Sequence, residues 1–154
     1  MKTINAHLRF LWLLSLAPCG LWPAVGAGFG DLNASVPVAI GKGFQLLKSA
    51  GPVAAFEAWR EGGVWDDAAK TTDETNKFKE MVKPLRNYRS YEVIEVKEIG
   101  KTSKILYVAM SFERGVLYGS FLVWKSDRDW IVQRMEFNTK PEVIMPWLAV
   151  GGGK

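Results

Sequence analysis

The fold class is decided by residues 105–137, ILYVAMSFERGVLYGSFLVWKSDRDWIVQRMEF. This stretch contains three runs rich in β-branched and aromatic residues, at 105–112, 116–124 and 130–137, and a similar run precedes it at 91–99. The hydrophobic period in these runs is close to two, which is typical of strands. The connections between them are short and rich in turn-forming residues, too short for parallel crossovers. We therefore predict four antiparallel strands within residues 88–138, arranged as a meander.

The preceding half of the chain is helical by pattern. Apolar residues recur at helical spacing in three segments, which begin near residues 38, 52 and 71. Pro52 suits the first position of the second helix, and Thr71 with Glu74 resembles a capping box that opens the third. Pro84 should end the regular part of that helix. The sequence thus predicts an α+β fold, with three N-terminal helices packed on one face of a curved four-stranded sheet.

This order of elements resembles the nuclear transport factor 2-like (cystatin-like) superfamily. The similarity in motif is confined to residues 107–146. The matching segments are Tyr107-Val108, Phe112–Gly115, Phe121–Trp124, Asp129–Val132 and Phe137–Pro141. They resemble small exported bacterial members of that superfamily to which no activity is assigned. The resemblance implies a cone-shaped space between the helices and the sheet, and it carries over no catalytic residue.

Residues 1–27 have the pattern of a cleavable signal peptide. Lys2 and Arg9 give a positive start, and an apolar run at 10–17 follows, too short to span a bilayer. Val25 and Ala27 place small residues before a cut after Ala27. Acylation at Cys19, as in a lipoprotein, is an alternative that the preceding proline disfavours. We expect a periplasmic or secreted protein without a stable membrane span.

Three parts are expected after the leader: a flexible lead-in at 28–37, one domain at 38–146 and a tail at 147–154. The only cysteine, Cys19, and the only histidine, His7, lie in the leader, so the mature part would contain neither. The net charge falls from +4 to +2, because Lys2 and Arg9 leave with the leader while all 16 acidic residues remain. Such a balanced charge predicts no nucleic-acid partner.

The same composition argues against several chemistries. A mechanism based on a Ser-His-Asp or Cys-His arrangement needs a histidine, and transition metals need thiolate or imidazole ligands. The carboxylate pairs Asp66-Asp67 and Asp73-Glu74 have the position of helix-start residues. We therefore predict no catalytic residue that can be named, no metal site and no cofactor.

Candidate ligand-binding residues come from one face of the predicted sheet. Strict alternation places Tyr107 of the second strand on the same face as three residues of the third strand, Tyr118, Ser120 and Trp124. The residues of the fourth strand on this face are Val132, Arg134 and Glu136. We expect Tyr107, Tyr118, Trp124 and Arg134 to contact a small, largely apolar ligand, with a carboxylate for Arg134. The simpler interpretation is that this is the solvated face of an antiparallel sheet.

The tryptophans of the mature part are expected to differ in burial. Trp59 and Trp130 should lie in the core, whereas Trp147 should be exposed or at an interface.

Three functions stay open at this point. The first is a non-catalytic binding or interaction module with a cone-shaped apolar pocket, either holding a small ligand or forming a homodimer through the sheet. The second is a histidine-free acid–base enzyme, an isomerase or dehydratase, that uses a tyrosine–carboxylate pair. The third is a structural envelope protein without a ligand. A closed cone with a carboxylate beside a tyrosine would favour the enzyme. An apolar cone without convergent polar groups would favour binding, and a cone filled by side chains would favour the structural role.

Overall fold

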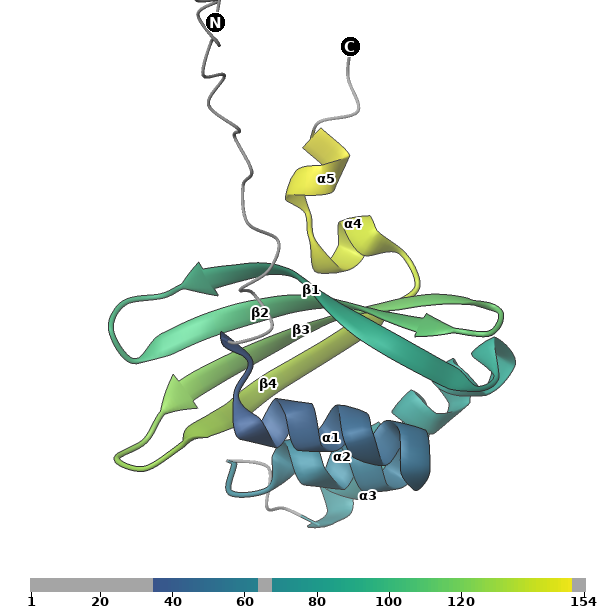
Figure 1. Cartoon of the computed structure of the whole chain (residues 1–154), viewed down its shortest axis with the longest axis horizontal. Helices are drawn as coiled ribbons and strands as arrows, with labels where there is room; N and C mark the ends of the chain where they lie inside the picture. Colours follow the sequence, from purple (N-terminus) through teal and green to yellow (C-terminus); the bar gives the residue numbers. More distant parts are fainter. Residues whose placement is uncertain (1–34, 64–67, 151–154) are drawn as a thin grey trace, which may run out of the picture.

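The computed structural model of the chain describes residues 35–63 and 68–150. The predicted leader with Cys19, the start of the lead-in, Trp65, the pair Asp66-Asp67 and the glycine-rich end lie outside the described residues. Within these limits the fold is α+β, with helices first and an antiparallel sheet after them (Figure 1).

Within the described residues, three α-helices precede the sheet, as predicted. They are α1 (Val38–Ser49), α2 (Pro52–Arg60) and α3 (Ala68–Val82), and the short 3-10 helix η2 (Lys83–Leu85) continues α3. Pro52 occupies the first turn of α2, directly after Gly51, whose φ of 92° suits glycine. The α-helical part of α3 ends before Pro84, because proline lacks the N–H that the helix needs.

The start of α3 was predicted wrongly. The helix begins at Ala68, so Thr71 lies inside it and is not its N-cap. A Thr-x-x-Glu spacing also occurs within helices, and the pattern by itself does not show where the first turn lies.

The sheet consists of four antiparallel strands in the order β1-β2-β3-β4, which confirms the predicted meander. The strands are β1 (Tyr88–Glu98), β2 (Ser103–Phe112), β3 (Gly115–Lys125) and β4 (Trp130–Asn138). Helices α1–α3 lie on one side of the sheet, and α4 (Pro141–Ile144) and α5 (Trp147–Val150) lie on the other (Figure 1). We call the side turned away from α1–α3 the open face.

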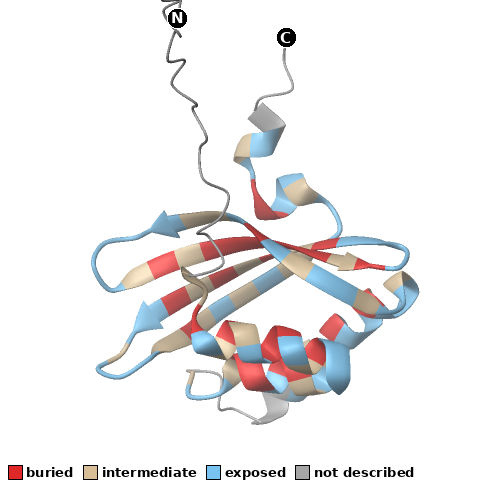
Figure 2. Ribbon diagram, viewed as in Figure 1, coloured by how far each residue is buried: buried red, intermediate tan, exposed pale blue. Residues whose placement is uncertain are grey.

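The core lies between α1–α3 and the sheet. On β2 it takes Leu106, Val108 and Met110, and the paired strand β3 adds Phe121 and Val123. Buried residues concentrate in the middle strands and on the helices beneath them (Figure 2). Burial of these apolar side chains is the main stabilising contribution to the fold.

A β-bulge in β4 corrects the predicted set of residues on the open face. Leu122 pairs with Arg134, but the next residue, Val123, pairs with Val132, so Gln133 is the extra residue. The bulge turns Val132 into the core, where it is 1% exposed, while Arg134 stays on the open face. Strict alternation had placed both on one face.

Candidate functional site

The four predicted ligand-binding residues share the open face. Tyr107 pairs with Ser120, Tyr118 with Ala109, Arg134 with Leu122 and Trp124 with Ser103, and paired residues project on the same side of a sheet. This side is opposite to α1–α3, so none of the four lines a space between the helices and the sheet. The sequence contained a signal for this: on β2 the core-facing positions from Leu106 to Phe112 are all apolar, whereas the other set includes serine and tyrosine.

The predicted cone between the helices and the sheet is filled by an aromatic cluster around Trp59. Its indole is fully buried and meets four phenylalanine rings at centroid distances of 5.2–5.8 Å. They are Phe44, Phe78, Phe121 and Phe137. The indole N–H donates a hydrogen bond to the carbonyl oxygen of Ile40, 3.1 Å away, so its one polar group is satisfied. The middle of this interior is therefore solid core.

A small apolar cleft lies where α3 meets the edge of the sheet. It has a volume of about 180 Å³ and is lined by Phe56, Phe78, Met81, Met135 and Phe137, with Glu74 and Lys77 at its rim. The cleft opens to solvent, and it could take a group of about the size of a benzene ring.

Tyr107 lies at the centre of the polar groups on the open face. It is buried, it pairs with Glu95 of β1, and Ser120 lies between it and Glu136 of β4. Burial raises the pKa of the Tyr107 phenol, the Glu95 and Glu136 carboxylates raise it further, and the Arg134 guanidinium opposes them. Tyr107 is thus held in its protonated form, suited to donating a hydrogen bond and unsuited to acting as a base.

The fold is expected to lose stability at alkaline pH. Burial also raises the pKa of the half-buried Tyr88, which packs edge-on against Phe112. The folded state holds the phenol protons of Tyr88 and Tyr107 more tightly than the unfolded chain, whose tyrosines titrate near pH 10. The stabilisation is therefore complete below about pH 10 and is lost as pH rises above it. Urea unfolding at increasing pH measures this loss. Tyr88→Phe should reduce the loss of stability at alkaline pH. An unchanged pH dependence in that variant would contradict the raised pKa of Tyr88 as its cause.

The exposed part of the open face combines aromatic, apolar and charged groups. The side chain of Trp124 is 40% exposed, and Tyr118 and Leu122 are half-buried. Charges of opposite sign stand side by side: Arg134 Nε lies 3.5 Å from Glu136 Oε1, and Lys97 Nζ lies 3.9 Å from Glu95 Oε1. These pairs are solvent-exposed, so they contribute little to stability.

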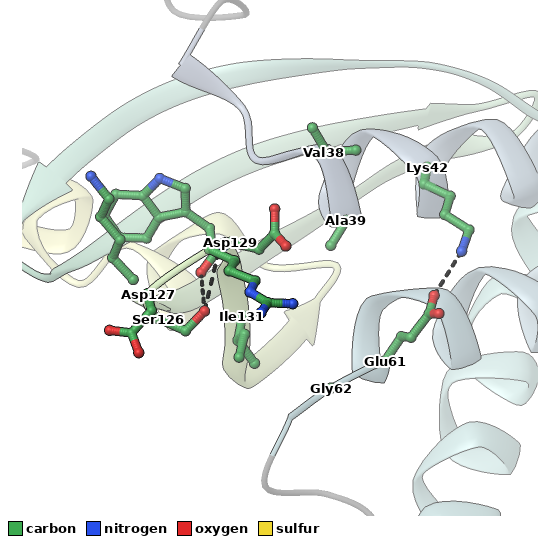
Figure 3. A pocket seen from close by; sticks show the side chains of 12 residues that line it. Val38, Ala39, Lys42, Glu61, Gly62, Ser126, Asp127, Asp129 and Ile131 are labelled. Atoms are coloured by element: carbon green, nitrogen blue, oxygen red, sulfur yellow. Dashed lines mark hydrogen bonds and ion pairs between the residues drawn. The ribbon is translucent and has the colours of Figure 1, made fainter.

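A second hollow, which the sequence did not predict, lies between the start of α1, the end of α2 and the β3–β4 hairpin (Figure 3). Its volume is about 720 Å³, and it opens widely to solvent. Lys42 and Glu61 form an ion pair of 2.6 Å along one wall, and Ser126 and Asp129 close the hairpin turn on the other. The lining carries both signs of charge, so it shows no preference for a charged ligand.

Lys104 fixes the chain at the entrance to α1. Its side chain is 7% exposed and donates a hydrogen bond to the carbonyl oxygen of Ser35 at 2.9 Å. The ammonium group also lies 4.5 Å from the ring centroid of Trp130, a cation–π contact. Trp130 is half-buried rather than buried as predicted, because it covers this lysine at the edge of the core.

Within the part of the chain that the structure describes, no three side chains of His, Cys, Asp or Glu gather as a metal site would require. Among the same residues, no helix is both long and apolar enough to cross a membrane. Comparison with protein-family models, with curated proteins and with solved structures found no match for this chain.

Proposed function

We propose that this protein is an exported, non-catalytic interaction module of the nuclear transport factor 2-like fold, and that its open face binds a second copy of the same chain. The observation that carries the proposal is the contrast between the two faces of the sheet. The face beneath α1–α3 is filled by the cluster around Trp59, whereas the open face presents Trp124 and Arg134 to solvent. Tryptophan, tyrosine and arginine are the residues that most often contribute strongly to protein–protein binding.

The charge pattern of the open face favours a second copy as the partner. The pairs Arg134–Glu136 and Lys97–Glu95 place both signs next to each other. A two-fold axis brings the same patch of both subunits together, so such a patch can face itself with positive groups opposite negative ones. A surface of one sign would repel its own copy.

The assignment to the superfamily rests on the order of elements. Three helices followed by a four-stranded antiparallel meander are compatible with that superfamily. Export rests on the leader pattern of residues 1–27.

The acid–base alternative has weaker support. Tyr107 has two carboxylates near it, but both lie on the open face with their side chains in contact with solvent. A catalytic carboxylate of this kind is usually enclosed by an apolar wall. The filled interior also removes the cone in which the reaction would occur. By the same criterion it favours a structural role over a ligand-binding cone, and what supports an interaction module instead is the exposed Trp124 and Arg134 of the open face.

Reversal of the charge at Arg134 is expected to weaken self-association. Arg134→Glu replaces the Arg134–Glu136 ion pair by two neighbouring carboxylates on the open face, and a two-fold axis would bring them against the same two on the second copy. We expect the dimer dissociation constant, measured by sedimentation equilibrium, to rise at least about tenfold. Lys79→Glu is the matched control. It changes the charge by the same amount at an exposed position of α3, away from the open face, and should have little effect on the dimer dissociation constant.

A charge swap sharpens this test. The double variant Arg134→Glu/Glu136→Arg restores both signs to the patch and should recover much of the lost affinity. A chain that stays monomeric at millimolar concentration, or an Arg134→Glu variant that associates like the unaltered protein, would refute the proposed surface.

A further inference from the structure

The C-terminal segment Pro141–Leu148 folds back over one half of the open face. Ile144 and Met145 point inward and are buried, and Trp147 meets Tyr107 edge-on at a centroid distance of 4.8 Å. Ile105 and Tyr118 pack against the same small cluster. In the figure, α4 and α5 stand over the sheet on the side opposite α1–α3 (Figure 1). The segment therefore hides Tyr107 from solvent and from any partner.

The contacts that hold this segment are few. Both α4 and α5 have four residues, and helices of that length are not stable without tertiary contacts. Beyond the inward side chains, the Lys97 ammonium lies 3.9 Å from the ring centroid of Trp147. The outer side of the segment faces solvent in the described part of the chain: Val143 is 53% exposed and Leu148 is 49% exposed. A segment anchored in this way belongs to the part of a fold that opens most easily.

The surface under the segment is continuous with the proposed binding surface. On neighbouring strands, Ile105 pairs with Leu122, and Tyr107 pairs with Ser120 beside Glu136. The covered half thus holds the buried tyrosine and the exposed half holds Trp124 and Arg134. A second copy docked on the exposed half would meet the edge of the segment before it reached Tyr107.

We infer that Pro141–Leu148 is an autoinhibitory cover, which limits association of the open face until it lifts from Tyr107. This inference rests on the proposed function, because the cover regulates the same surface. In a closed molecule only the exposed half can bind, and full contact requires the open state. The observed association constant then equals the intrinsic association constant multiplied by the fraction of molecules that are open. Loosening the cover must strengthen association, whereas loosening a segment that belongs to the interface would weaken it.

The test compares two substitutions in the same segment of the full mature chain. Trp147→Ala removes the contact with Tyr107 and the indole under Lys97, while Leu148→Ala removes an apolar group that points outward. Hydrogen exchange of the backbone amides of residues 142–145, 147 and 148 reports opening, and sedimentation equilibrium reports association. We expect Trp147→Ala to speed exchange and to lower the dimer dissociation constant about tenfold. Leu148→Ala should leave both unchanged.

Each other outcome has a defined meaning. Faster exchange with unchanged or weaker association in Trp147→Ala overturns the cover, and if Arg134→Glu still weakens association, the proposed surface survives. If neither Trp147→Ala nor the unaltered chain associates, both proposals fail together. If Trp147→Ala unfolds the domain, Trp147→Leu makes the same comparison, because it keeps an apolar side chain but loses both ring contacts.

Discussion

Substitution of Trp59 by alanine is expected to lower the free energy of unfolding by about 3–5 kcal/mol. The indole is fully buried and touches four phenylalanine rings, and it links α2 to α1 and to β3 and β4. Its removal leaves a large cavity that the surrounding rings cannot fill without leaving their own positions. Since domains of this size are stable by about 5–15 kcal/mol, the variant should be close to unfolding.

Trp59→Phe separates the parts of this effect. It keeps an aromatic ring in the cluster but lacks the indole N–H that donates to Ile40. The decrease in the free energy of unfolding should therefore be clearly smaller than for alanine. Urea unfolding followed by circular dichroism measures both variants. A loss of less than about 1 kcal/mol for Trp59→Ala would mean that the interior is not packed as described.

Two glycine-to-alanine substitutions in α1, at Gly43 and Gly41, should change stability in opposite directions. A Cβ built on Gly43 falls on the ring atoms Nε1, Cδ1 and Cε2 of Trp59, closer than any real contact. The indole cannot move aside, because its neighbours hold it and its N–H is bonded to Ile40. We expect Gly43→Ala to destabilise the fold by about 1–3 kcal/mol or more through overpacking.

Gly41→Ala is the internal control. A Cβ at Gly41 has nothing within 4 Å, so alanine adds helix propensity without a clash. The substitution should stabilise the fold by about 0.5–1 kcal/mol. Thermal unfolding of the two variants beside the unaltered protein gives the comparison directly. Equal shifts of the melting temperature, with the same sign in both variants, would show that α1 does not approach Trp59 closely at Gly43.

The sequence predicted the elements well where a local pattern carried the information. The three segments of helical period became α1, α2 and α3, and the runs of period two became β1–β4. Pro52 and Pro84 marked the start of α2 and the end of α3, because proline acts through its own ring and missing N–H. Capping chemistry was less reliable, since the same residue pair occurs inside helices as well as at their ends.

The candidate site was predicted only in part. Tyr107, Tyr118, Trp124 and Arg134 were correctly assigned to one face, but their position relative to the helices was wrong. The bulge at Gln133 could not be expected from alternation, which assumes one partner for each residue. Their role in binding stays a prediction. Sequence patterns also gave no sign that Trp147 would cover Tyr107.

The sequence by itself determined the type, number and order of the main elements and the antiparallel pairing of the strands. Hydrophobic period and connection length act over a few residues, so they can be recognised without knowledge of the rest of the chain. Only the tertiary structure decided that Trp59 fills the interior and that the C-terminal segment lies over Tyr107. These arrangements depend on the fit between side chains far apart in the chain, such as Gly43 with Trp59 or Tyr107 with Trp147, and close packing between distant residues is not encoded in any local pattern.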